Sequence, residues 1–189
     1  MMFGHVDAPR HWARHLVRLR ELQRRTGGFT EFVPLPFVAA EAPIYAAGAA
    51  RRGPSFREAV LVHAFARIVF HGLIDNIQAS WVKLGTSGVE ACLQAGANDV
   101  GGTLMNESIT RAAGAKHGEE WSPGSIESTI SNLGRVPLQR TTLYGTASFE
   151  RNNAAMRARP LSSAINTPPC RARNERPRVP LVSRLQNTG

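Results

Sequence analysis

The stretch that decides the fold is GLIDNIQASWVKLG, residues 72–85. Its centre is short and rich in residues that favour β-structure, and glycine bounds it on both sides. We therefore predict a strand over residues 76–84. Side chains alternate between the two faces of a strand, so Gln78 and Ser80 share one face, which we expect to be the polar one, and Lys83 reaches the rim at the end of the strand.

Strand signals alternate with helix signals along the rest of the chain. Residues 29–35 and 100–104 have the same strand character, and residues 1–4 resemble the end of a further strand. A strand–helix alternation at this interval is typical of parallel sheets. The sequence therefore predicts an α/β fold in which residues 29–35 and 76–84 are neighbouring parallel strands.

Four helices are predicted from capping signals and apolar spacing. The first begins at the N-cap Asp7, presents an apolar stripe of Trp12, Leu16, Leu19 and Leu22, and ends at Gly27. The second begins at the capping box of residues 55–58. Its buried face is expected to contain Leu61, Ala64, Phe65 and Ile68.

The third helix begins near Ser87 and the fourth at Ser122. After Gly145 no periodic pattern remains, and residues 146–189 are rich in Arg, Asn, Ser and Pro. We predict two parts, a folded α/β domain over residues 1–145 and a disordered tail over residues 146–189.

Composition bounds the function. The chain has 189 residues, fewer than the roughly 250 of a complete (β/α)₈ barrel. It has neither a run of about 18 apolar residues nor a signal-peptide pattern, so we expect a cytoplasmic protein without membrane partners. Its two cysteines, Cys92 and Cys170, define neither a disulfide framework nor a metal site. His11 and His15 share a helix face without an evident third ligand, so no metal site is expected.

The formal net charge of +9 is unevenly distributed. Residues 151–189 contain eight arginines and one acidic residue, whereas residues 1–150 are nearly neutral. Residues 151–189 contain no aromatic residue on which a nucleic-acid base could stack. Nucleic acid is therefore not the expected partner, and a basic tail that attracts phosphates weakly is kept as an alternative.

Three long strings carry a resemblance to a known family. They are MMFGHVDAPRHWARHLVRLRELQRRTGGFTEFVPLPF (residues 1–37), GLIDNIQASWVKLG (72–85) and NDVGGTLMNESITRAAGA (98–115). They resemble the 4-hydroxybenzyl-transferring component of FO synthase, a radical S-adenosylmethionine (SAM) enzyme of deazaflavin (coenzyme factor 420) biosynthesis. FO is 7,8-didemethyl-8-hydroxy-5-deazariboflavin. Radical SAM enzymes of the futalosine route to menaquinone share parts of these strings and are the alternative.

The resemblance implies a fold, substrates and cofactors. The family fold is a TIM-type barrel, and residues 1–145 would correspond to strands 5 to 8 with their helices, the C-terminal half. The family joins L-tyrosine to 5-amino-6-(D-ribitylamino)uracil through a 5′-deoxyadenosyl radical that a 4Fe–4S cluster generates from SAM. The missing N-terminal half of the barrel is then a candidate partner.

The chain departs from the family at the cluster. The family holds its cluster with three cysteines spaced C-x-x-x-C-x-x-C, and this sequence contains no such motif. We therefore expect no cluster in this chain and no catalysis by the chain alone. A non-functional gene fragment is a further alternative.

Candidate ligand-binding residues follow from the rule that barrel enzymes bind ligands at the carboxyl ends of their strands. Glu31 is added because a lone carboxylate in an apolar strand needs a partner, either a ligand or a structural ion pair. Arg140 is added because it could pair a substrate carboxylate, an ordinary ion pair being the other interpretation. The candidates for SAM or substrate binding are His5, Glu31, Gln78, Ser80, Lys83, Gly101, Gly102, Thr103, Asn106, Glu107 and Arg140.

Overall fold

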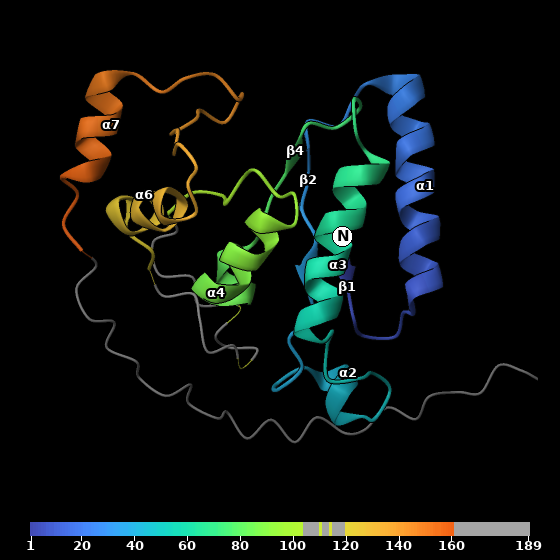
Figure 1. Cartoon of the computed structure of the whole chain (residues 1–189). Coiled ribbons are helices and arrows are strands. Elements are labelled where there is room, and N and C mark those ends of the chain that lie inside the picture. Colours follow the sequence, from blue (N-terminus) through green and yellow to red (C-terminus); the bar gives the residue numbers. More distant parts are fainter. Residues whose placement is uncertain (104–109, 111–113, 115–119, 161–189) are drawn as a thin grey trace, which may run out of the picture.

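The computed structural model describes residues 1–103, 110, 114 and 120–160. Within them, short parallel strands are covered by helices (Figure 1). The strands are β1 (Met2–Phe3), β2 (Glu31–Phe32), β3 (Leu35–Pro36) and β4 (Asn76–Ile77). The expected α/β class with parallel pairing is therefore confirmed, but a closed barrel is not seen in these residues.

Backbone pairing places four segments side by side in chain order. β1 pairs in parallel with β3, and β2 pairs in parallel with β4. Because β2 and β3 belong to one extended segment, residues 31–36 bridge the two pairs. A parallel bridge between Gln78 and Asp99 adds a fourth segment. The predicted neighbourhood of residues 29–35 and 76–84 is thus confirmed by the pairing of β2 with β4.

The predicted length of the second strand is wrong. Only Asn76–Ile77 forms a strand, and helix α4 (Trp81–Gln94) begins where the strand was expected to continue. Ser80 is the N-cap of this helix, and Lys83 lies in its first turn. The β-forming character of Trp81 and Val82 reflects burial, since both lie in the first turn of α4 and are buried in the core. Likewise, residues 100–103 form no strand beyond the bridge at Asp99.

Side chains alternate across the sheet as parallel strands require. Phe32, Pro34 and Pro36 are buried, while Glu31 and the intervening residues are half-buried. Phe32 packs edge-on against Phe70 with ring centroids 5.0 Å apart. The helices therefore cover one face of the sheet, and the opposite face carries Glu31 and, on the next segment, Gln78.

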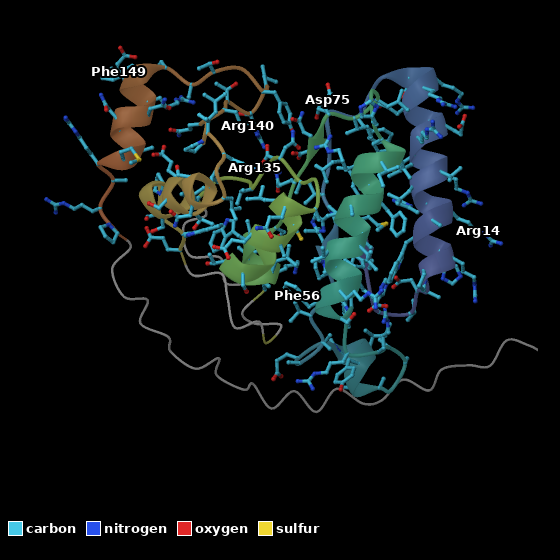
Figure 2. All side chains as sticks on the ribbon, in the orientation of Figure 1. Arg14, Phe56, Asp75, Arg135, Arg140 and Phe149 are labelled. Atoms are coloured by element: carbon cyan, nitrogen blue, oxygen red, sulfur yellow. The ribbon has the colours of Figure 1, made fainter. Side chains whose placement is uncertain are left out.

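Helix α1 (Pro9–Thr26) lies beside helix α3 (Phe56–Val69) (Figure 1). Of the predicted apolar stripe, Trp12 and Leu16 are buried, whereas Leu19 is half-buried and Leu22 is exposed. Arg14 projects away from α3 (Figure 2). The predicted N-cap is wrong by one residue. Ala8 is the N-cap, and its backbone N–H donates to Nδ1 of His11 over 3.0 Å.

The predicted buried face of α3 is wrong. Leu61, Phe65 and Ile68 are exposed, and the buried residues are Ala59, Val62, His63 and Ala66. Small side chains at Ala59 and Ala66 allow the helix to approach the strands and α1 closely, which apolar spacing alone does not reveal. The helix start is as predicted, because Ser55 and Glu58 form the capping box.

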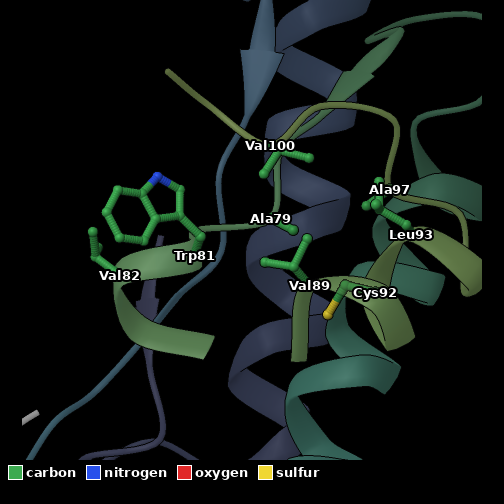
Figure 3. Close-up of a cluster of buried hydrophobic side chains, with 8 residues drawn as sticks. All are labelled: Ala79, Trp81, Val82, Val89, Cys92, Leu93, Ala97 and Val100. Atoms are coloured by element: carbon green, nitrogen blue, oxygen red, sulfur yellow. The ribbon is translucent and has the colours of Figure 1, made fainter. Parts of the chain in front are cut away.

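Helix α4 supplies the second part of the core. Its chain breaks at Gly85, whose φ of 65° and ψ of 178° are not helical, so the residues after it form a separate run. This run matches the helix predicted from Ser87. Its buried side chains pack with the ends of two parallel segments (Figure 3). The cluster contains Ala79, Trp81, Val82, Val89, Cys92, Leu93, Ala97 and Val100.

The C-terminal helices are α6 (Pro123–Asn132) and α7 (Phe149–Met156). Helix α6 begins at Ser122 as predicted, and it packs on α4. Helix α7 lies inside the segment expected to be disordered, so ordered structure continues past residue 145. Residues 161–189 of the expected tail lie outside the described residues, and the division into two parts stays a prediction. A four-residue helix, α2 (Pro43–Ala46), lies near the carboxyl ends of the strands.

No helix in the described part of the chain is long and apolar enough to cross a membrane.

The buried His63 predicts acid sensitivity. Its side chain is fully buried on α3, with Nδ1 2.8 Å from the carbonyl oxygen of Ala59, and burial lowers its pKa from 6.5. The unfolded chain takes up the proton near the ordinary pKa, whereas the folded chain resists it. The free energy of unfolding should therefore fall as pH drops below about 6.5 towards the lower folded-state pKa.

We expect His63→Gln to remove this part of the pH dependence, because glutamine is uncharged throughout. Urea unfolding at pH 7.5 and pH 5.5 compares the two proteins, and the five other histidines are common to both. An identical loss of stability in both proteins would contradict the assignment to His63.

Candidate functional site

The parallel segments have two ends, and the predicted site residues divide between them. His5, Ser80, Gly102 and Thr103 lie where the segments end. Glu31 is instead the first residue of β2, and Asp99 is the first of its segment. Figure 1 shows β2 and β4 starting near the top of the view and α2 at the bottom. Glu31 therefore lies at the amino end of the parallel segments, away from His5, which follows β1.

At the carboxyl end, His5 is held by its neighbours. Its Nδ1 lies 2.7 Å from a carboxylate oxygen of Asp7, and its ring packs on Phe37 with centroids 5.6 Å apart. Burial disfavours the ionised form of Asp7. Hydrogen bonds from the backbone N–H groups of Gly4 and His5 outweigh that effect and hold the pKa of Asp7 below its usual value. An ionised Asp7 fixes the orientation of the imidazole.

The start of α4 brings further polar groups to this end. Nζ of Lys83 lies 3.4 Å from the hydroxyl oxygen of Thr110. The indole of Trp81 donates to the carbonyl oxygen of Gly102 over 3.1 Å and stacks edge-on against Trp121. This contact ties the exposed Gly102 and Thr103 to the first turn of α4. Asn106 and Glu107 lie outside the described residues.

The backbone of Gly101 is engaged within the chain. Its φ of +71° suits glycine, and its backbone N–H donates to Oδ1 of Asp99 over 2.7 Å.

Around Glu31, five side chains form what we call the polar cluster: Glu31, Gln78, Asp99, Arg140 and Tyr144. Oε2 of Glu31 accepts the hydroxyl of Tyr144 at 2.5 Å and the amide of Gln78 at 3.2 Å. Nη2 of Arg140 lies 3.7 Å from the same oxygen, and its Nε donates to Asp99. The guanidinium also lies over the ring of Tyr144, 4.3 Å from its centroid.

The charged groups of the cluster are paired with one another, because Arg140 lies between the carboxylates of Glu31 and Asp99. The hydrogen bond to Asp99 raises the pKa of Arg140, so the guanidinium stays charged. Burial and the hydrogen bond to Glu31 raise the pKa of Tyr144 to about 12, so the phenol stays a donor. Arg140 reaches the sheet from the C-terminal segment, as Figure 2 shows.

This geometry bears on the two interpretations of Glu31 and Arg140. Each finds its partner within the chain, at the end of the sheet away from the carboxyl-end residues. The position thus favours the structural ion pair over ligand binding at both residues. Asp99 and Tyr144 were not among the candidates. Tyr144 lies only four residues after Arg140, but they reach Glu31 and Asp99 through tertiary contact alone.

An iron–sulfur cluster does not fit the cysteines of this chain. Three thiolates are needed, and the sequence has two cysteines. Cys92 is buried in the core, where burial raises the pKa of its thiol to about 12, so it stays protonated. Cys170 lies outside the described residues. No group of three or more His, Cys, Asp or Glu side chains suited to a metal occurs in the described part.

Comparison with known proteins places these residues in a family. The model of the family described as CofH/MqnC C-terminal region matches residues 26–153. The chain is 56% identical over 144 residues to a Mycobacterium tuberculosis protein named FO synthase. It is 58% identical over 144 residues to a Methanopyrus kandleri protein named 5-amino-6-(D-ribitylamino)uracil–L-tyrosine 4-hydroxyphenyl transferase. A Streptomyces coelicolor FO synthase is 54% identical over 155 residues.

These matches cover 76% to 82% of this chain, but only 17%, 39% and 18% of the three relatives. The chain thus spans well under half the length of the curated relatives that it matches. The matched family region extends through residue 153 and so includes the polar cluster and most of α7. On the extent of this match, the chain belongs to the CofH/MqnC C-terminal region family.

Proposed function

We propose that the chain is the C-terminal part of a transferase that joins the 4-hydroxybenzyl group of L-tyrosine to 5-amino-6-(D-ribitylamino)uracil. The observation that carries the proposal is the identity of 58% to the relative that bears this enzyme's name. The FO synthase relatives agree with it, and none of the three relatives described above bears a menaquinone-pathway name. The full-length enzyme would use SAM and a 4Fe–4S cluster, whose ligands this chain lacks.

In this proposal, the carboxyl ends of the parallel segments form part of the wall of the substrate cavity. His5, Ser80, Lys83 and Thr103 offer hydrogen-bonding groups of the kind that ribityl, ribose or amino-acid carboxylate groups require. Their role is to bind and orient a ligand. The polar cluster, which surrounds Glu31 at the start of β2, connects the sheet to the C-terminal segment.

The proposal predicts that the chain alone binds no iron–sulfur cluster. After anaerobic reconstitution with ferrous iron and sulfide, the desalted chain should contain neither iron nor acid-labile sulfide in stoichiometric amounts. The reason is the lack of a thiolate trio together with the protonated, buried thiol of Cys92. A desalted chain that retains one 4Fe–4S cluster per molecule, seen in its absorption spectrum, would contradict this expectation.

Activity should require the missing part of the enzyme. The chain alone should form no product from tyrosine, the aminouracil and SAM. Addition of the part of the Methanopyrus kandleri relative outside its match to this chain should restore turnover. Product formation is followed anaerobically by mass spectrometry. Turnover of futalosine-pathway substrates in place of these would overturn the assignment.

A matched pair of variants tests which end of the sheet meets the substrate. Thr103 and Thr30 are both exposed, but they lie at the carboxyl end and the amino end, respectively. Loss of one hydrogen bond costs about 1 kcal/mol, roughly fivefold in binding. We expect Thr103→Val to raise KM for one substrate about fivefold in the restored enzyme, while Thr30→Val leaves KM unchanged. An effect confined to Thr30→Val would place the site at the amino end.

A further inference from the structure

The segment between α6 and α7, residues 135–147, forms what we call the strap. Its inward side chains bind the rest of the protein. Arg135 donates to the carbonyl oxygens of Ala97 and Leu93 over 3.1 and 2.7 Å, at the end of α4. Arg140 and Tyr144 belong to the polar cluster. The strap is thus bound to the rest of the protein near its start, through Arg135, and further along, through Arg140 and Tyr144.

The backbone of the strap is also ordered. Residues 140 and 146 form an antiparallel bridge, and the N–H of Thr141 donates to the carbonyl oxygen of Gly145 over 2.7 Å. Tyr144 has a φ of 61°, a conformation that few residues other than glycine adopt. Such a conformation persists only where surrounding contacts hold it, and here the contacts with Glu31 and Arg140 do so.

The outward side chains of the strap are large, apolar and almost wholly exposed. Val136 and Leu143 are each 92% exposed, and Leu138 is 72% exposed. A single exposed apolar residue needs no explanation, but three on one ordered segment indicate a surface that a partner covers. The family match spans residues 26–153, so these three residues lie inside the matched region.

The location of the strap indicates what covers it. Asp99 pairs with Gln78 on one side, and the described residues provide no strand on its other side. The strap is bound to Asp99 through Arg140. Any polypeptide that adds to this edge of the sheet therefore lies next to the strap. The Methanopyrus kandleri relative has more than half of its length outside the match, so that longer protein contains further polypeptide that is available to occupy this edge.

We propose that Val136, Leu138 and Leu143 form the contact surface for the part of the longer enzyme that this chain does not contain. The inference rests on the proposed function only in assuming that this chain and the remainder of the longer enzyme act together. The polar cluster holds the strap in place, so the apolar surface is preorganised for its partner. Burial of the three side chains on association replaces the water that now covers them.

A second exposed apolar face offers an internal control. Leu61, Phe65 and Ile68 line the outer side of α3, and Ile68 is 71% exposed. Nothing in the structure indicates what covers that face. Ile68→Asp therefore introduces the same type of charge at a similarly exposed apolar position, away from the strap.

The test measures association of this chain with the part of the Methanopyrus kandleri relative outside its match, expressed as a separate polypeptide. Isothermal titration calorimetry gives Kd for the unmodified chain, for Val136→Asp combined with Leu143→Asp, and for Ile68→Asp. We expect the strap variant to raise Kd at least tenfold and Ile68→Asp to change it less than twofold. Circular dichroism should show all three chains equally folded, because the altered side chains are exposed.

Hydrogen exchange provides a second measurement on the unmodified chain, and amides of residues 136–143 should exchange more slowly in the complex. The inference fails if no complex forms, if the strap variant binds equally well, or if exchange in the strap is unchanged. It also fails if the strap variant abolishes only self-association, since the occupant would then be a second copy. If the strap variant supports the same turnover as the unmodified chain, this inference alone is overturned. If the complex forms and depends on the strap but gives no turnover, the proposed function alone is overturned.

Discussion

The structure depends on the backbone hydrogen bonds that residues 31–37 make on both sides. The N–H groups of Leu35 and Phe37 donate to the carbonyl oxygens of Met1 and Phe3, and the N–H of Gln78 donates to the carbonyl oxygen of Phe32. One extended segment thereby aligns its two neighbours in parallel. Because parallel strands must be connected by crossovers, α1 and α3 are both brought to the same covered face.

This alignment places different groups of side chains along the sheet. The carboxyl end gathers hydrogen-bonding side chains next to exposed backbone, as parallel α/β proteins do at their ligand sites. The amino end has a cluster in which Arg140 satisfies Glu31 and Asp99. A charged side chain already held by two opposite charges has little left to offer an anionic ligand. The same cluster anchors the strap, so the sheet and the C-terminal segment stabilise each other.

Several elements could be predicted because their signals are local. The capping boxes and N-cap serines place the starts of α3 and α6, and the parallel pairing of residues 31–32 with 76–77 follows from the strand–helix alternation. The length of the strand after Asn76 could not be predicted. Trp81 and Val82 favour strands in general, but here they are buried as part of the first turn of α4.

The sequence by itself determined the class of fold, the starts of several helices and, through long strings of identity, the family. It also determined that no thiolate trio is present, since that is a matter of composition. Only the tertiary structure decided which face of α3 is buried and that Glu31, Asp99, Arg140 and Tyr144 meet. The reason is that contacts between residues far apart in the chain depend on how the segments are packed, and no local pattern records that packing.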